Sequence, residues 1–187
     1  MKILQLSPKV EVRLPEDWAL YRKEAHADKK RIDIKELGDI KEPLYTSISL
    51  LSDSSGTLLD YDNLIPGAED LLKAFKEKLG FQNIFVVSGN WKCASRERDS
   101  LNDSKLVNDF RSVSDEKKYY AGNHGIPFLL EDTSEAQGAK KFLIQHEDKP
   151  TRQVWTIGVP YVEEYSPEVI DEITKAVLEV SKELKKL

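Results

Sequence analysis

The chain of 187 residues carries 28 Lys and Arg against 33 Asp and Glu, a formal net charge of −5, with 40% hydrophobic and 33% charged residues. This length fits one domain, and the balance of apolar and charged residues excludes a disordered or membrane-embedded chain. The negative charge argues against a nucleic-acid partner, because binding to a phosphate backbone needs accumulated positive charge. We expect a single water-soluble domain over residues 1–187.

The sequence offers no sign of secretion or membrane insertion. No stretch approaches the roughly 20 apolar residues that span a bilayer, and the longest pure run is residues 84–87. The apolar stretch at the start is too short for a signal peptide. A single cysteine, Cys93, cannot form an internal disulfide. These features predict a cytoplasmic protein without a membrane span, although a mature secreted domain would look the same after loss of its signal.

The first half of the chain alternates apolar and polar residues in three places. This pattern predicts strands at residues 10–14, 31–37 and 44–51. A short apolar run at residues 83–88 then predicts a buried strand.

Two segments carry clear helix signals. Residues 68–79 place leucines and a phenylalanine on one side, and Gly80 is positioned to cap the C-terminus. Near the end of the chain, Ser166 precedes a proline and a glutamate, a combination that favours a helix beginning at Pro167. The apolar positions that follow have three-and-four spacing, so the last helix should pack one face on a sheet.

The remaining segments are less regular. Residues 89–116 are polar and predict a long excursion, whereas residues 117–121, 126–131 and 153–162 predict strands. Residues 136–145 fit either a helix or a strand. The expected fold class is α+β, a mainly antiparallel sheet packed against helices on its faces, with a C-terminal amphipathic helix.

The histidines and the cysteine form no recognisable metal-binding or catalytic motif in the sequence. His26, His124 and His146 lie far apart, and none has a second metal ligand at the usual spacing, so no metal site is expected. The Gly-Asn-His-Gly context of His124 favours a turn over a catalytic base. A phosphatase-type thiolate loop would need an arginine six residues after Cys93, where Asp99 stands.

The most specific chemical pattern begins at an aspartate. Residues 53–58 read Asp-Ser-Ser-Gly-Thr-Leu, a Pro-Gly pair follows at 66–67, and residues 84–90 read Ile-Phe-Val-Val-Ser-Gly-Asn. Together they resemble the first half of a haloacid dehalogenase-type phosphohydrolase. The resemblance implies that Asp53 attacks phosphorus and that Ser88 binds phosphate.

The same resemblance is incomplete at one position. Ser55 stands where the family has the aspartate that shuttles the proton, and a serine cannot serve as that acid and base. Lys118 and Asp132 are the candidates for the family's later lysine and acidic residue, and the implied cofactor is magnesium.

A second resemblance depends on the order of elements. Leu14-Pro15-Glu16-Asp17-Trp18 after an opening strand is similar to the Leu-Pro-x-x-Trp entry of the PsbP-like family, whose members are α/β/α sandwiches. The predicted strands, internal helix and closing helix follow a compatible order. This resemblance implies a binding function, usually toward protein partners, with no shared catalytic residues.

Three functional hypotheses follow. The leading one is a non-enzymatic binding module with a protein partner and no catalytic residue, cofactor or metal, because no catalytic constellation is complete. The alternative is a diverged phosphohydrolase that uses Asp53 with magnesium. The third is an acidic partner of a basic protein, suggested by Glu163, Glu164 and Glu168 beside Tyr161 and Tyr165. The sequence sets no oligomeric state.

The direction of the sheet discriminates between the first two hypotheses. A parallel sheet with Asp53 and Ser88 side by side favours the enzyme, whereas an antiparallel sheet favours the binding module.

Overall fold

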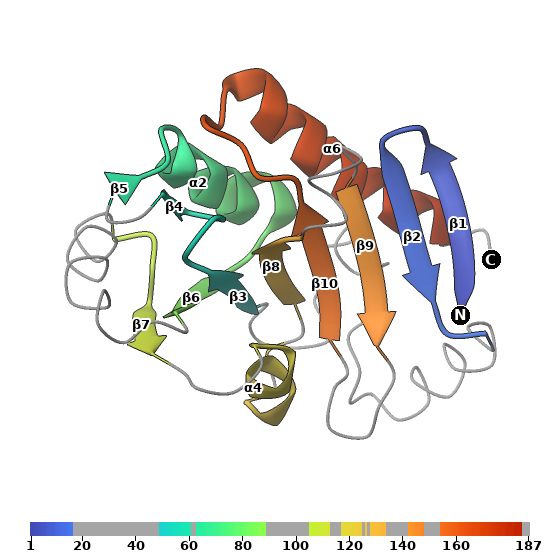
Figure 1. The fold of residues 1–187 in the computed structure, drawn as a ribbon, viewed down its shortest axis with the longest axis horizontal. Helices are drawn as coiled ribbons and strands as arrows, with labels where there is room; N and C mark the ends of the chain where they lie inside the picture. The colour runs from blue at the N-terminus through green and yellow to red at the C-terminus, as the bar shows by residue number, and fades with distance from the viewer. Residues whose placement is uncertain are drawn as a thin grey trace.

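The computed structural model describes residues 1–16, 49–60, 63–88, 105–112, 117–124, 126, 128–133, 142–147 and 154–184. These residues form an eight-stranded mixed sheet, a small two-stranded sheet and three helices (Figure 1). The large sheet contains β1 (Lys2–Ser7), β2 (Val10–Leu14), β3 (Ser49–Asp53), β6 (Asn83–Ser88), β7 (Asp109–Ser112), β8 (Phe128–Asp132), β9 (Phe142–Glu147) and β10 (Val154–Val159). The small sheet pairs β4 (Leu59–Asp60) with β5 (Asn63–Leu64), and the helices are α2 (Ala68–Leu79), α4 (Lys117–Asn123) and α6 (Pro167–Leu184).

The strands of the large sheet lie in the order β1-β2-β9-β10-β8-β3-β6-β7. Neighbours from β10 through β8, β3 and β6 to β7 are parallel, as are β2 and β9. Among the described pairs of this large sheet, only β1–β2 and β9–β10 are antiparallel. The fold is therefore α/β with a mostly parallel sheet, and the expectation of a mainly antiparallel sheet is wrong. Alternating hydrophobicity reports which face of a strand is buried, but it carries no information about the direction of the neighbouring strand.

The two faces of the sheet pack against different helices. Leu50 and Leu130 point into the larger hydrophobic core, which they share with residues of α2 and α6. Their sequence neighbours Leu51 and Leu129 point the other way, into a smaller cluster that includes Ala121 of α4. This alternation follows from the two-residue period of a strand, so each strand residue can be assigned to the α2/α6 face or the α4 face.

The helix predictions at both places are confirmed, including their ends. Gly80 ends α2 in the left-handed conformation with φ 77°; its N–H donates to the Lys76 carbonyl, and the Phe81 N–H donates to the Phe75 carbonyl, both at 3.2 Å. At the start of α6, the Val169 N–H donates to Ser166 Oγ at 3.3 Å. Predicted strands at residues 10–14 and 83–88 are also present.

Other predictions need correction. Residues 117–121 begin helix α4 rather than a strand, because packing of Ala121 into the smaller core outweighs the strand propensity of two adjacent tyrosines. Residues 136–145, for which helix and strand were both open, overlap strand β9. The predicted excursion at residues 89–116 contains strand β7. The predicted strand at residues 31–37 lies outside the described residues. No helix in the described part of the chain is long and apolar enough to cross a membrane.

Candidate functional site

Three neighbouring parallel strands end at the same edge of the sheet with polar residues. Asp53 is the last residue of β3, Ser88 of β6 and Asp132 of β8. The β3–β6 register pairs Asp53 with Val87, so Ser88 lies one residue further along the adjacent strand. The carboxyl ends of parallel strands are the usual place for ligand sites in open α/β sheets. Three of the four residues predicted for the phosphohydrolase site therefore lie at the same edge of the sheet.

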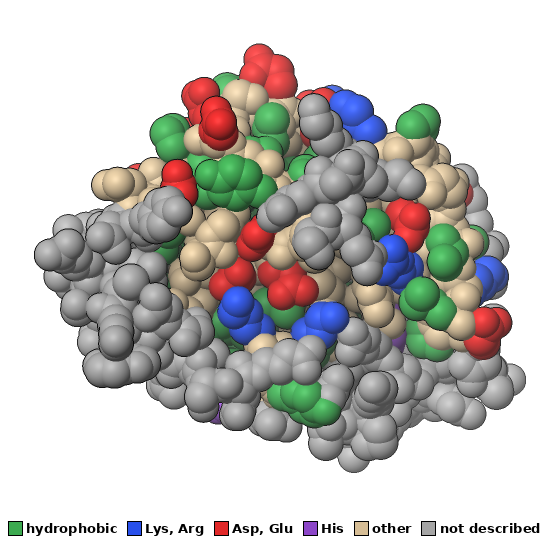
Figure 2. All heavy atoms as spheres, in the orientation of Figure 1, with side chains coloured by type: hydrophobic (Ala, Val, Ile, Leu, Met, Phe, Trp, Pro, Cys, Tyr) green, Lys and Arg blue, Asp and Glu red, His purple; other side chains and the backbone are tan. Residues whose placement is uncertain are grey.

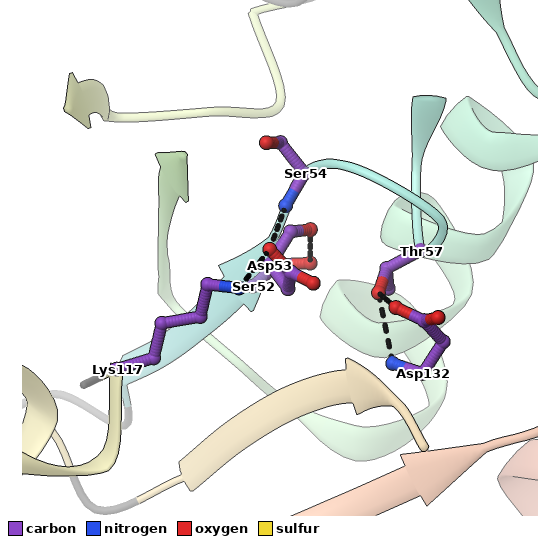
Figure 3. Close-up of polar contacts among 6 residues, drawn as sticks. All are labelled: Ser52, Asp53, Ser54, Thr57, Lys117 and Asp132. Carbon is purple, nitrogen blue, oxygen red and sulfur yellow. Dashed lines mark hydrogen bonds and ion pairs between the residues drawn. The ribbon is translucent and has the colours of Figure 1, made fainter. Parts of the chain in front are cut away.

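The carboxylate of Asp53 is buried and held through one oxygen. The side-chain ammonium of Lys117 lies 2.7 Å from Asp53 Oδ1, and the Ser54 N–H donates to the same oxygen at 2.8 Å (Figure 3). No hydrogen bond or ion pair from the described residues reaches Oδ2. Burial raises the pKa of Asp53 above its ordinary value, and the Lys117 charge opposes that rise. The arrangement leaves one oriented oxygen of the carboxylate for a ligand.

The lysine that contacts Asp53 is Lys117, the first residue of α4, and the lysine named from the sequence, Lys118, is its neighbour. Lys118 instead lies near Glu131, whose pKa its charge lowers. Burial nevertheless raises the pKa of Glu131 overall. Figure 2 shows basic and acidic side chains meeting in the middle of this face of the molecule.

Glu131 is a further acidic residue beside the candidate site, close enough to Lys117, Lys118 and Asp53 for their charges to act on its pKa. Its neighbour Leu129 belongs to the α4-side cluster, so the alternation along β8 places Glu131 on the α4 face. Leu51 and Asp53 stand in the same relation on β3. The available signal was a pair of acids directly after an apolar strand, of which only Asp132 was considered.

Asp132 is fixed by reciprocal hydrogen bonds with Thr57. The Thr57 hydroxyl donates to Asp132 Oδ1 at 3.0 Å, and the Asp132 N–H donates to Thr57 Oγ1 at 2.9 Å (Figure 3). Gly56 makes room for this carboxylate, because a Cβ there would lie 2.7 Å from Asp132 Oδ2, and its φ of +78° also favours glycine. The loop after β3 is thereby joined to the end of β8.

In the loop after Asp53, three backbone N–H groups donate to one carbonyl. The Ser54 carbonyl accepts the N–H groups of Thr57, Leu58 and Leu59 at 3.3, 2.8 and 2.9 Å. Ser54 itself is fully buried, whereas the side chain of Ser55 is exposed. The loop therefore presents a hydroxyl at position 55, which does not replace the proton-transfer capacity of a carboxylate.

The implied magnesium ion can be tested against these donors. Among the described residues, no three His, Cys, Asp or Glu side chains come together as a metal cage. Asp53 and Asp132 do provide carboxylates from neighbouring strands that lie close enough for the Asp132 charge to raise the pKa of Asp53. Magnesium is commonly held by one or two carboxylates with water and phosphate oxygens completing its shell. The residues fit an ion bound jointly with a phosphorylated ligand.

The other candidates from the sequence lie apart from this edge. A ring nitrogen of His124 lies 2.9 Å from the Tyr120 carbonyl oxygen at the exposed end of α4. His146 is buried in β9 against the ring of Trp155. His26 and Cys93 lie outside the described residues. Of the acidic patch, Glu163 and Glu164 are exposed, but Tyr165 is 2% exposed and does not belong to that surface.

Comparisons with protein-family models, with curated proteins and with solved structures found no match. Both resemblances therefore stay predictions. For the PsbP-like one, Leu14 is the last residue of β2, Pro15 follows it, and Asp17 and Trp18 lie outside the described residues.

Proposed function

We propose that this protein is an enzyme that transfers the phosphoryl group of a phosphate ester to Asp53 and then to water. One observation carries this proposal. A buried aspartate ends the central parallel strand, with one oxygen held by an ammonium and a backbone N–H and the other oxygen without a partner among the described residues. Nucleophilic carboxylates form covalent intermediates in this way in several classes of enzyme.

In the first step, Asp53 Oδ2 attacks phosphorus while the bond from phosphorus to the ester oxygen breaks. The departing oxygen takes its proton from water, since Ser55 cannot donate one at neutral pH. Lys117 holds the attacking carboxylate in place through Oδ1, and the Ser88 hydroxyl at the end of β6 binds a phosphoryl oxygen. Magnesium, when bound, would supply positive charge against the phosphoryl oxygens.

In the second step, water attacks phosphorus of the aspartyl phosphate, the bond from phosphorus to Oδ2 breaks, and inorganic phosphate leaves. Asp53 is regenerated as a carboxylate. Without a carboxylate at position 55 to activate the water, this step is expected to be slow. Because no side chain at position 55 protonates the departing oxygen in the first step, donors with stable leaving anions, such as aryl phosphates, are the best first substrates.

The test is hydrolysis of p-nitrophenyl phosphate by the full chain with magnesium. Asp53→Asn should lower kcat on the order of 10³-fold or more, because it removes the attacking oxygen. The matched control is Asp60→Asn, which changes an exposed aspartate on β4 and should leave kcat unchanged. Turnover that is absent in the unaltered protein, or that survives Asp53→Asn, would exclude the proposal.

A non-enzymatic binding module, with a protein as its partner, is the second candidate. The serine at position 55 favours it, because a site that lacks its proton-transfer group can keep affinity for a phosphorylated partner without turnover. This candidate predicts that titration calorimetry detects Asp53-dependent binding of a phosphorylated peptide while no hydrolysis occurs.

A further inference from the structure

Tyr165 lies far from Asp53 in sequence but reaches the loop that follows it. It precedes α6, is 2% exposed, and its hydroxyl donates to the Thr57 carbonyl at 2.6 Å. The Tyr165 N–H donates to the Pro66 carbonyl at 2.8 Å. One residue of the C-terminal segment therefore holds both the beginning and the end of the connection between β3 and α2.

The approach of Tyr165 to this connection is close at a second point. A Cβ at Gly67 would lie 2.0 Å from the Tyr165 carbonyl oxygen, and Gly67 has φ +82°. Only glycine fits both conditions. The absence of a side chain at Gly67 thus allows the Tyr165 backbone to pack directly against residue 67.

Thr57 connects Tyr165 to the site. Its backbone carbonyl accepts from the Tyr165 hydroxyl, while its side-chain hydroxyl both donates to and accepts from Asp132. The Thr57 hydroxyl can donate one hydrogen bond, and its acceptor is the Asp132 carboxylate. Rotation of the Thr57 backbone would therefore misalign the two bonds that fix the Asp132 carboxylate.

The electrostatics agree with this connection. Burial raises the pKa of Tyr165, and the charge of Asp132 raises it further, so the hydroxyl keeps its proton and remains a donor. The charge of Asp132 also acts on Asp53. Asp132 is thus close enough to influence both the tyrosine and the nucleophile.

We infer that Tyr165 is a positioning residue for the reaction at Asp53, and that it acts through Thr57 and Asp132. This inference rests on the proposed phosphoryl transfer. The hydroxyl carries the effect, because a phenylalanine would fill the same volume but would leave the buried Thr57 carbonyl without its donor.

The first experiment compares Tyr165→Phe with Tyr161→Phe, which removes the hydroxyl of a tyrosine that is 39% exposed. With p-nitrophenyl phosphate and magnesium, Tyr165→Phe should lower kcat about 10-fold, because small misplacements of reacting groups are costly. The KM should change less than about twofold, and circular dichroism at the assay temperature should show a folded protein. The control should match the unaltered protein.

A double-mutant cycle identifies the route. Thr57→Val removes the hydroxyl that holds Asp132, and Thr57→Ser keeps it. If Tyr165 acts through Thr57, adding Tyr165→Phe to Thr57→Val should cause no further loss of kcat, whereas the loss should persist in Thr57→Ser. Additive losses in the Thr57→Val background would overturn the inference.

The results distinguish a failure of the proposed function from a failure of the role inferred for Tyr165. An unaltered protein without Asp53-dependent turnover removes the proposed function and this inference with it. An active protein in which Tyr165→Phe retains full kcat overturns the inference alone. A loss of activity in proportion to the unfolded fraction would assign Tyr165 to stability, and would also overturn it.

Discussion

Helices α2 and α6 cover one face of the sheet with 12 and 18 residues, whereas α4 packs on the other face with 7. The longer helices share the larger hydrophobic core, and the α4 face has the smaller cluster. Asp53 and Glu131 follow the alternation onto the α4 face, next to the lysines of α4. Among the described residues, the α2/α6 face therefore supplies most of the apolar packing, and the α4 face holds the charged groups.

Two adjacent leucines on β8 test most directly whether the α2/α6 face contributes more to stability than the α4 face. Leu129 and Leu130 are both fully buried, and they point into opposite clusters. Leu130→Ala should lower the free energy of unfolding by about 4 kcal/mol and Leu129→Ala by about 2.5 kcal/mol, since the cost grows with the cavity that cannot collapse. Urea denaturation measures both, and equal losses would contradict the assignment of stability to the α2/α6 face.

Gly67, which precedes α2, tests whether packing on the α2/α6 face affects activity at Asp53. Gly67→Ala should cost about 2 kcal/mol or more, because it adds left-handed strain and a clash with Tyr165. The control is Gly80→Ala at the other end of α2, where φ is 77° and only the strain of about 1 kcal/mol is expected. Thermal unfolding ranks the two. If Gly67→Ala also lowers kcat per folded molecule, then the contact between Gly67 and Tyr165 on the α2/α6 face affects the reaction at Asp53.

The smallest expected effect concerns pH and the α4 face. Burial raises the pKa of Glu131 above its ordinary value of 4.5, so the folded state binds this proton more tightly than the unfolded state. Its contribution to stability is fully present below pH 4.5 and is lost as the pH rises through the folded-state pKa.

The variant Glu131→Gln removes this dependence. We expect the free energy of unfolding of the unaltered protein to fall relative to that of Glu131→Gln as the pH increases from 4.5. Urea titrations at a series of pH values measure the difference. Parallel curves would show that Glu131 titrates as it does in the unfolded chain.

Local sequence signals predicted the helices and several strands, but they could not predict how the strands pair. Caps at Gly80 and Ser166 act within a few residues, so the sequence displays them directly. The direction of β3 relative to β6 and β8 depends on contacts between distant segments. The pattern at residues 44–51 also suggested a strand with one polar face, whereas β3, at residues 49–53, is central and almost wholly buried.

The candidate site was predictable to the extent that it lies in short motifs. Asp53, Ser88 and Asp132 were named from the sequence, and each ends a strand at the same edge of the sheet. Lys117 was missed in favour of its neighbour, because the rotation of a helix decides which of two adjacent lysines faces the carboxylate. Tyr165 was placed in a surface patch, since no local pattern reveals a hydrogen bond to a loop more than a hundred residues earlier.

The pairing of β2 with β9 imposes an order of events on folding. Val10 pairs with Phe142, although β1 and β2 are neighbours in the chain and form a local hairpin. During synthesis at about 5–20 residues per second, the hairpin would wait on the order of 10 s for its parallel partner to be made. Such distant contacts slow folding, so the β1–β2 hairpin should join the sheet only after β9 has been made.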